Sequence, residues 1–156
     1  MKRRDFLART SLFAAAGCLT RAQAAVAPAT PPPAAPNAVP ATEFRPLRRN
    51  VGIFTGQGGT IGWLARADAL AVVDPQFPAT ASACLAGLPG RASRKVDVLI
   101  NTHHHGDHTS GNPIFKPAVK TIVAHANVPK LQFAAAEKAG TLDKQVYADK
   151  TFANVW

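Results

Sequence analysis

Cysteine is scarce in this chain of 156 residues, which contains only Cys18 and Cys84. Cys18 lies in an N-terminal segment that we expect to be cleaved off, so the mature chain would keep a single thiol and form no intrachain disulfide. Cys84 stands among Ala and Leu, and we interpret it as a small buried apolar residue rather than a nucleophile. The sequence therefore excludes a fold held together by disulfides.

Acidic and aromatic residues are also few. The chain has 9 Asp and Glu against 18 Lys and Arg, and its aromatic content is 7%. Residues 1–24 hold five of the basic residues and one acidic residue, so their removal leaves a mild basic excess. Because no basic run is interleaved with aromatic residues, the sequence does not indicate nucleic-acid binding.

Long hydrophobic runs are absent. The mildly apolar stretch Thr10–Leu19 is too short to span a bilayer by itself. It follows Lys2-Arg3-Arg4-Asp5-Phe6-Leu7, which resembles a twin-arginine export signal, and it precedes the small residues Ala22-Gln23-Ala24. We therefore predict a signal peptide over residues 1–24, cleavage after Ala24, the twin-arginine export machinery as a partner, and a periplasmic or secreted location.

A lipid anchor is the alternative to release by cleavage. Ala15-Ala16-Gly17-Cys18 is a weak lipobox, and lipidation at Cys18 would leave the protein attached to a membrane. The Leu that usually stands three places before the Cys is missing, so we rank this alternative second.

Proline and alanine dominate the segment after the predicted signal. Val26–Thr42 consists mostly of these two residues, with three consecutive prolines at 31–33. Such a segment buries too little apolar surface to offset its ordering entropy. We predict a disordered linker over residues 25–42 and a folded domain over residues 43–156.

Alternating apolar residues then predict a β-hairpin. Val51–Thr55 and residues 60–65 have strand character, and Gly56-Gln57-Gly58-Gly59 separates them. A nucleotide-binding loop is disfavoured because Ile61 takes the place of the third glycine and a strand follows instead of a helix.

The remaining elements are predicted from spacing and capping residues. A strand at 70–73 ends at Asp74, and Ala81, Cys84 and Leu88 mark the buried side of a helix at 78–87. Further strands are expected at 96–100 and 121–124, with a short helical turn at 109–115 between them. A last helix at 128–139 would be capped by Asn127 and ended by Gly140.

Histidine is concentrated in one place. Four of the five histidines fall within residues 103–108, together with Asp107, directly after the apolar run at 96–100. Imidazole and carboxylate groups bind zinc and similar divalent metals. If His103 and His105 point to one side of the loop, His104 points elsewhere, so we do not count it as a ligand. A histidine-rich surface loop that binds metal adventitiously is the alternative, and the carboxylate at this spacing disfavours it.

This segment resembles the His-x-His-x-Asp-His signature of the metallo-β-lactamase-fold hydrolases. Thr102 before it and Gly111-Asn112 after it also match, and the likeness extends over roughly residues 51–152. The resemblance implies an α+β fold: the N-terminal half of an αββα sandwich, with a mixed, mostly antiparallel sheet covered by helices.

The resemblance also implies a site with two zinc ions. His103 and His105 would hold the first zinc and Asp107 and His108 the second, with Asp107 in the catalytic position. A hydroxide held between the ions would attack an ester, thioester or amide carbonyl of a small-molecule substrate. Asp74 would accept a hydrogen bond from a ligand imidazole and fix its orientation. The alternative for Asp74 is a carboxylate that caps the following turn.

The family pattern places further ligands later in the chain. His125 does not match any of them, so we leave it out, and we expect residues 43–156 to form a domain incomplete at its C-terminus and inactive as a hydrolase. The alternative function is a non-catalytic periplasmic metal-binding protein in which four donors hold one ion.

Overall fold

The structure is a computed structural model that describes residues 42–57, 59–92 and 94–155, all within one compact unit. The predicted signal peptide, with Arg3, Arg4 and Cys18, lies outside the described residues, as does the predicted linker up to residue 41. Export, cleavage and lipidation therefore stay predictions. Among the helices of the described residues, none has the length and apolar character needed to cross a bilayer.

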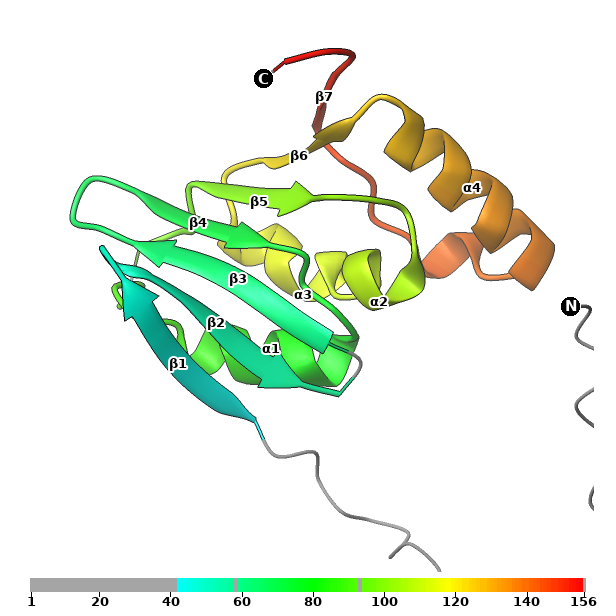
Figure 1. Ribbon diagram of the computed structural model, residues 1–156. Coiled ribbons are helices and arrows are strands. Elements are labelled where there is room, and N and C mark those ends of the chain that lie inside the picture. The colour runs from blue at the N-terminus through cyan, green and yellow to red at the C-terminus, as the bar shows by residue number, and fades with distance from the viewer. Residues whose placement is uncertain (1–41, 58, 93, 156) are drawn as a thin grey trace, which may run out of the picture. The chain divides into compact units, whose positions relative to one another are not determined.

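Seven strands form one mixed sheet in which neighbours in the sequence are neighbours in space (Figure 1). Pairing is antiparallel from β1 to β4 and parallel from β4 to β7. The mixed sheet confirms the predicted fold class. The strands are β1 Glu43–Arg48, β2 Val51–Gly56, β3 Gly59–Ala65, β4 Leu70–Val73, β5 Val98–Asn101, β6 Ile122–His125 and β7 Lys150–Phe152.

The glycine-rich turn joins β2 and β3 as a hairpin, as predicted. Gly56 pairs with Gly59, and Phe54 pairs with Ile61. The alternation in the sequence places Phe54 and Ile61 on one face, where they are 2% and 0% exposed. The nucleotide-loop alternative is therefore wrong.

Helices cover this face of the sheet. Figure 1 shows α1 (Pro78–Gly87) and α3 (Asn112–Phe115) behind the strands, and the two helices pack against each other. Ala81, Cys84 and Phe115 are fully buried in the core. Burial raises the pKa of the Cys84 thiol to about 12, which confirms that Cys84 is an inert core residue.

The opposite face of the sheet is also apolar, but it is more exposed. Ile53, Leu64, Val73 and Ile100 alternate with the core residues along their strands, and each is only partly buried. In the described part of the chain, these side chains are therefore partly exposed to water.

Short helices and one long helix complete the fold: α2 Gly106–Thr109, the 3₁₀ turn η1 Lys116–Ala118, α4 Asn127–Ala139 and the 3₁₀ turn η2 Leu142–Lys144. Gly140 ends α4 in the left-handed conformation (φ 65°), as predicted. The predicted Asn127 cap is wrong: Asn127 is the first helical residue, and the capping position belongs to Ala126, which makes no side-chain cap.

The parallel strands fix where the functional residues meet. β4, β5 and β6 end at the same edge of the sheet, and the residues after these ends are Asp74, Thr102 and Ala126. In sheets of this kind, ligands bind outside the carboxyl ends of the strands. The histidine-rich loop begins at this edge.

Candidate metal centre

Asp74 ties the end of β4 to the start of the histidine loop. Its carboxylate accepts hydrogen bonds from the backbone N–H of Thr102 at 2.8 Å and from the Thr102 hydroxyl at 2.6 Å. Asp74 is 6% exposed and has a positive φ of 56°, a conformation that Asp tolerates better than most residues. The sequence folds this way because β4 and β5 are adjacent and parallel, with Val73 opposite Ile100.

The short helix α2 presents the second half of the motif. It begins after His105, whose carbonyl accepts hydrogen bonds from the His108 N–H and from the Thr109 hydroxyl. Asp107 and His108 lie on this single turn, and the His108 ring reaches Asp74 and His103 at the ends of β4 and β5. Gly111 follows, and it must be glycine because a Cβ there would lie 2.4 Å from the Pro75 carbonyl oxygen.

The donor atoms of the motif occur in two close pairs. His103 Nε2 lies 3.2 Å from His105 Nδ1, with the rings nearly perpendicular at 77°. Asp107 Oδ2 lies 3.3 Å from His108 Nε2. Two ligand atoms of a tetrahedral zinc ion are separated by about 3.3 Å, given metal–ligand distances near 2.0–2.1 Å. Both pairs have this spacing, which is also that of a direct polar contact between the two side chains, and they are the two pairs implied by the resemblance.

The two pairs also lie next to each other. The ring centroids of His103 and His108 are 3.9 Å apart. Among the described residues, no group of three or more His, Cys, Asp or Glu side chains converges to hold a single ion. The donor types, imidazole and carboxylate, are those that bind zinc and similar divalent ions.

His108 is oriented from behind by Asp74. Its Nδ1 atom lies 2.9 Å from Asp74 Oδ2, which leaves Nε2 to face Asp107. The distance is that of a hydrogen bond, although the alignment at Nδ1 falls short of one. The hydrogen bond from a ligand imidazole to Asp74 that the resemblance implies therefore stays a prediction.

Burial lowers the pKa of His103, and the neighbouring His108 and His105 lower it further, while the carboxylates of Asp74 and Asp107 act in the opposite direction. The shift favours the neutral imidazole. Neutral imidazole is the form that binds metals.

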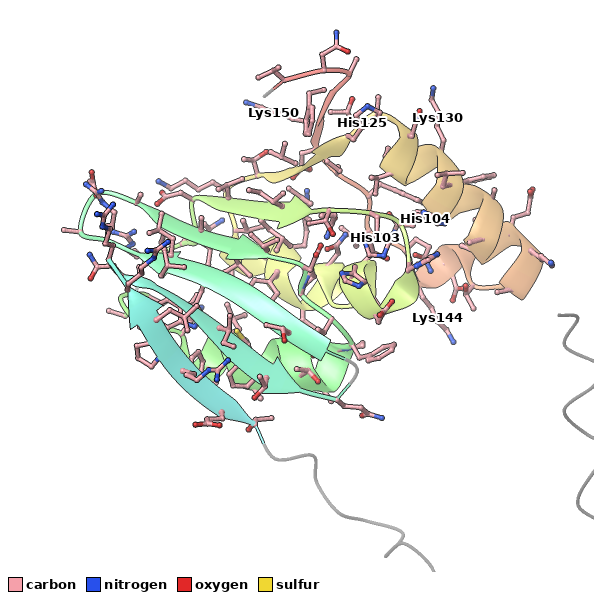
Figure 2. All side chains as sticks on the ribbon, viewed as in Figure 1. His103, His104, His125, Lys130, Lys144 and Lys150 are labelled. Carbon is pink, nitrogen blue, oxygen red and sulfur yellow. The ribbon has the colours of Figure 1, made fainter. Side chains whose placement is uncertain are left out.

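His104 lies beside His105 and farther from His103. Its ring centroid is 6.4 Å from that of His103 and 4.6 Å from that of His105 (Figure 2 labels His103 and His104). It lines a cavity of about 190 Å³ shared with Gln132 and Ala136 of α4. No hydrogen bond within the described residues involves the His104 ring. The exclusion of His104 from the ligand set stays a prediction.

His125 has both ring nitrogens occupied by the protein. Nε2 lies 2.9 Å from the Ala153 carbonyl oxygen, and Nδ1 accepts a hydrogen bond from the Asn127 N–H at 3.2 Å. It stands at the carboxyl end of β6 and holds the turn into α4, so its role here is structural.

Sequence reasoning missed an amide pair beneath the motif. The side chains of Asn101 and Asn112 exchange hydrogen bonds of 3.0 and 2.9 Å, and both residues are at most 2% exposed. Asn101 also donates to the His108 carbonyl at 3.1 Å, and Asn112 donates to the Val146 carbonyl at 2.9 Å. The pair therefore fixes the backbone of His108. Asn101 ends a buried strand and Asn112 is part of the matched signature, and these were the only signals available in the sequence.

The sequence model of the Metallo-beta-lactamase superfamily matches residues 54–150. Solved structures with the same fold include three metallo-beta-lactamases. The protein from Hirschia baltica has 20% identity and a TM-score of 0.55, with 74% of this chain and 53% of that chain covered. The protein from Pontibacter korlensis has 18% identity and a TM-score of 0.52, with 73% and 54% covered. The protein from Erythrobacter litoralis, solved with beta-mercaptoethanol in its active site, has 20% identity and a TM-score of 0.54, with 72% and 50% covered.

This chain spans about half the length of those structures. At 18–20% identity, the likeness to them shows the fold alone. A comparison with curated proteins found no match. The sequence model covers more than half of the chain and includes the whole histidine motif. The chain therefore belongs to the metallo-beta-lactamase superfamily, whose members generally bind metal ions and are usually hydrolases.

Proposed function

We propose that this chain carries the metal-binding loop of a zinc-dependent hydrolase that acts on an ester, thioester or amide carbonyl. The observation that supports it most directly is the pairing of donors: 3.2 Å between His103 and His105, and 3.3 Å between Asp107 and His108. In this proposal the first pair holds one zinc ion and the second pair holds another, with Asp107 in the catalytic position.

The residues around the pairs have separate tasks. Asp74 holds His108 so that its Nε2 atom faces the metal, and Thr102 holds Asp74 through two hydrogen bonds. The amide pair Asn101–Asn112 fixes the backbone at His108. Bound zinc lowers the pKa of water to about 7 and polarises a carbonyl, which is the chemistry that such a site supplies.

A metal-binding protein without catalysis is the weaker candidate. Four donors that hold one ion would have to converge on one point, whereas no three of them do so within the described residues. The chain covers about half of the matching structures, so the substrate and activity of the whole protein are part of the proposal.

Metal analysis of single variants of the chain tests the pairing. We expect His103→Ala and His105→Ala to empty one site and Asp107→Ala and His108→Ala to empty the other. His104→Ala is the matched control because it removes an imidazole from the same loop. Zinc stoichiometry and the visible spectrum of the cobalt-loaded chain report the two sites separately. An equal loss of metal from His104→Ala would contradict the assignment.

Hydrolysis is tested independently on thioester, ester, lactone and β-lactam substrates with zinc present. We expect no turnover by this chain, because each metal ion would have only two protein ligands, and turnover that a chelator abolishes would contradict this expectation. Export belongs to the same proposal, because the predicted signal would deliver the folded, metal-loaded protein to the periplasm. Replacing Arg3 and Arg4 by lysine should leave the protein in the cytoplasm. Recovery of that double variant outside the inner membrane would show the twin-arginine assignment to be wrong.

A further inference from the structure

The turn between β1 and β2 combines exposed apolar side chains with arginines, at the edge of the sheet opposite the metal-binding loop (Figure 1). We call residues 45–51 the arginine turn. It contains Arg45, Arg48 and Arg49, together with Leu47 and Val51. Nothing in the proposed hydrolase site uses these residues.

The backbone of the arginine turn pushes its side chains outward. The register between β1 and β2 shifts between Pro46 and Arg48, which leaves Leu47 as the extra residue of a bulge. Arg49 and Asn50 both have positive φ angles, 50° and 63°, which turn the chain tightly at the tip. As a result Leu47 is 56% exposed and Val51 is 41% exposed.

The charges of the arginine turn are not neutralised within the described residues. None of Arg45, Arg48 and Arg49 has a carboxylate within ion-pair distance in that part of the chain. The aspartates at this edge already have partners: Asp68 is paired with Arg66, Asp97 with Lys120 and Asp149 with Lys116. Figure 2 shows nitrogen-tipped side chains gathered at this end of the sheet.

The surface around the turn is hollowed. Leu47, Arg48, Arg49 and Val51 line a concavity of about 550 Å³. A second one of about 340 Å³ adjoins it, where the turn faces Trp63 and the Pro89–Gly90 loop. A concavity lined by both apolar and arginine side chains fits a partner that offers negative charge and acyl chains together.

We propose that the arginine turn docks the protein on a bilayer surface that contains anionic phospholipid. Arginines near such a surface are attracted by its negative potential, and exposed aliphatic side chains enter the boundary between headgroups and acyl chains. A free phosphate would use the arginines but not Leu47 and Val51. Docking through this edge would leave the metal-binding loop at the opposite edge facing solution.

Vesicle binding of the full chain tests the proposal. We expect binding to phosphatidylglycerol-containing vesicles and little binding to pure phosphatidylcholine. Arg48→Ser with Arg49→Asn removes two charges and keeps a residue at position 49 that tolerates positive φ. Each arginine contributes about a fivefold change in partitioning, so the double variant should bind about 25-fold more weakly. High salt should also weaken the binding of the wild-type chain to anionic vesicles.

Arg66→Ser is the matched control, because Arg66 lies in the β3–β4 turn at the same edge but is paired with Asp68 at 2.9 Å. It should change binding less than twofold. A loss equal to that of the double variant would overturn the proposal. Equal binding to neutral vesicles would also overturn the proposal, as would saturable binding of inorganic phosphate without vesicle binding. A dimer that Leu47→Ser dissociates would overturn it too. Unchanged thermal unfolding of the variants separates these outcomes from misfolding.

A fluorophore attached at one position reports membrane contact at that position alone. Leu47→Cys in a Cys18→Ser background carries an environment-sensitive fluorophore at the arginine turn, since Cys84 is fully buried. Its emission should shift to the blue on anionic vesicles. The same label at Leu142→Cys, which is 40% exposed on η2, should not shift. A shift at position 142 without one at position 47 would show that another surface makes the contact.

Discussion

Where the parallel strands begin, aspartates are paired with lysine, and where these strands end, aspartates face imidazoles. Asp97 accepts a hydrogen bond from the Leu70 N–H at 2.7 Å and contacts Lys120 Nζ at 2.6 Å. Asp149 in the same way accepts from the Ile122 N–H at 2.8 Å and contacts Lys116. Each of these carboxylates joins two strands and has its own cation.

At the other edge Asp74 and Asp107 contact His108, and no lysine or arginine lies within ion-pair distance of either in the described residues. A carboxylate as buried as Asp74 needs hydrogen bonds or a positive partner. The N–H and hydroxyl of Thr102 supply the hydrogen bonds, and no lysine or arginine of the described residues supplies the charge. The comparison shows one edge whose carboxylates are paired with lysine and another whose carboxylates contact imidazole. In the proposed function this second edge binds the metal ion.

The largest effect is expected at Asp107. Because the outer partners of metal ligands change affinity by about 10–100-fold, loss of a ligand should weaken zinc binding by more than about 100-fold at its site. Asp107→Ala tests this, and competition with a chromogenic chelator measures the affinity. Unchanged zinc binding in Asp107→Ala would contradict the proposed difference between the two edges, because the Asp107 carboxylate would then not contribute to metal binding.

The next effect is expected at Asp74. Asp74→Asn keeps the size of the side chain and removes its charge, so His108 loses the carboxylate at 2.9 Å. We expect zinc affinity to fall about 10–100-fold. Asp97→Asn is the matched control at the opposite edge and should leave zinc affinity unchanged. Equal losses in the two variants would mean that the effect comes from the fold and not from the site.

Neutral groups hold the backbone at the metal-binding edge. Asn112→Ala leaves the buried Asn101 amide without its partner, so we expect unfolding free energy to fall by about 1–3 kcal/mol. Urea unfolding of the metal-free chain measures it. Asn127→Ala, at an exposed asparagine on α4, should change the unfolding free energy little. A result near zero for Asn112→Ala would show that the amide pair does not stabilise this edge.

The sequence predicted those parts of the molecule whose signals are local. The hairpin of β2 and β3, the strand β4 and the helix α1 follow from alternation or helical spacing within a few residues, and the structure confirms them. β1 and β7 were not predicted. β1 contains Pro46 and mostly exposed residues, and β7 has three residues, so both depend on pairing with a neighbouring strand.

The residues of the candidate site also divide into those that a local pattern predicts and those that it does not. The four proposed ligands fall within six consecutive residues, and their pattern could be recognised directly. The contact between Asn101 and Asn112 depends on how α2 and α3 fold back onto β5, which no local pattern reveals. Alternation predicted that His104 points away from the donors, but its ring lies 4.6 Å from that of His105, so the distances do not separate it from the ligands.

The smallest effect is expected at Asp149, and it should depend on pH. The hydrogen bond from Lys116 and then the one from the Ile122 N–H lower the pKa of Asp149 below its ordinary value. A carboxyl group whose pKa is lower in the folded state stabilises the protein above its unfolded pKa of about 3.9, and this contribution is lost as pH falls through the folded value. Because the side chain is about one-third exposed, solvent weakens the ion pair, and Asp149→Asn should cost about 1 kcal/mol or less at pH 7. The difference between the wild-type chain and Asp149→Asn in urea unfolding should shrink steadily below pH 4. A difference that stays constant from pH 7 to pH 3 would show that the Asp149 carboxylate acts through its shape or through neutral hydrogen bonds. Ion pairing with lysine would then not distinguish this edge from the metal-binding edge.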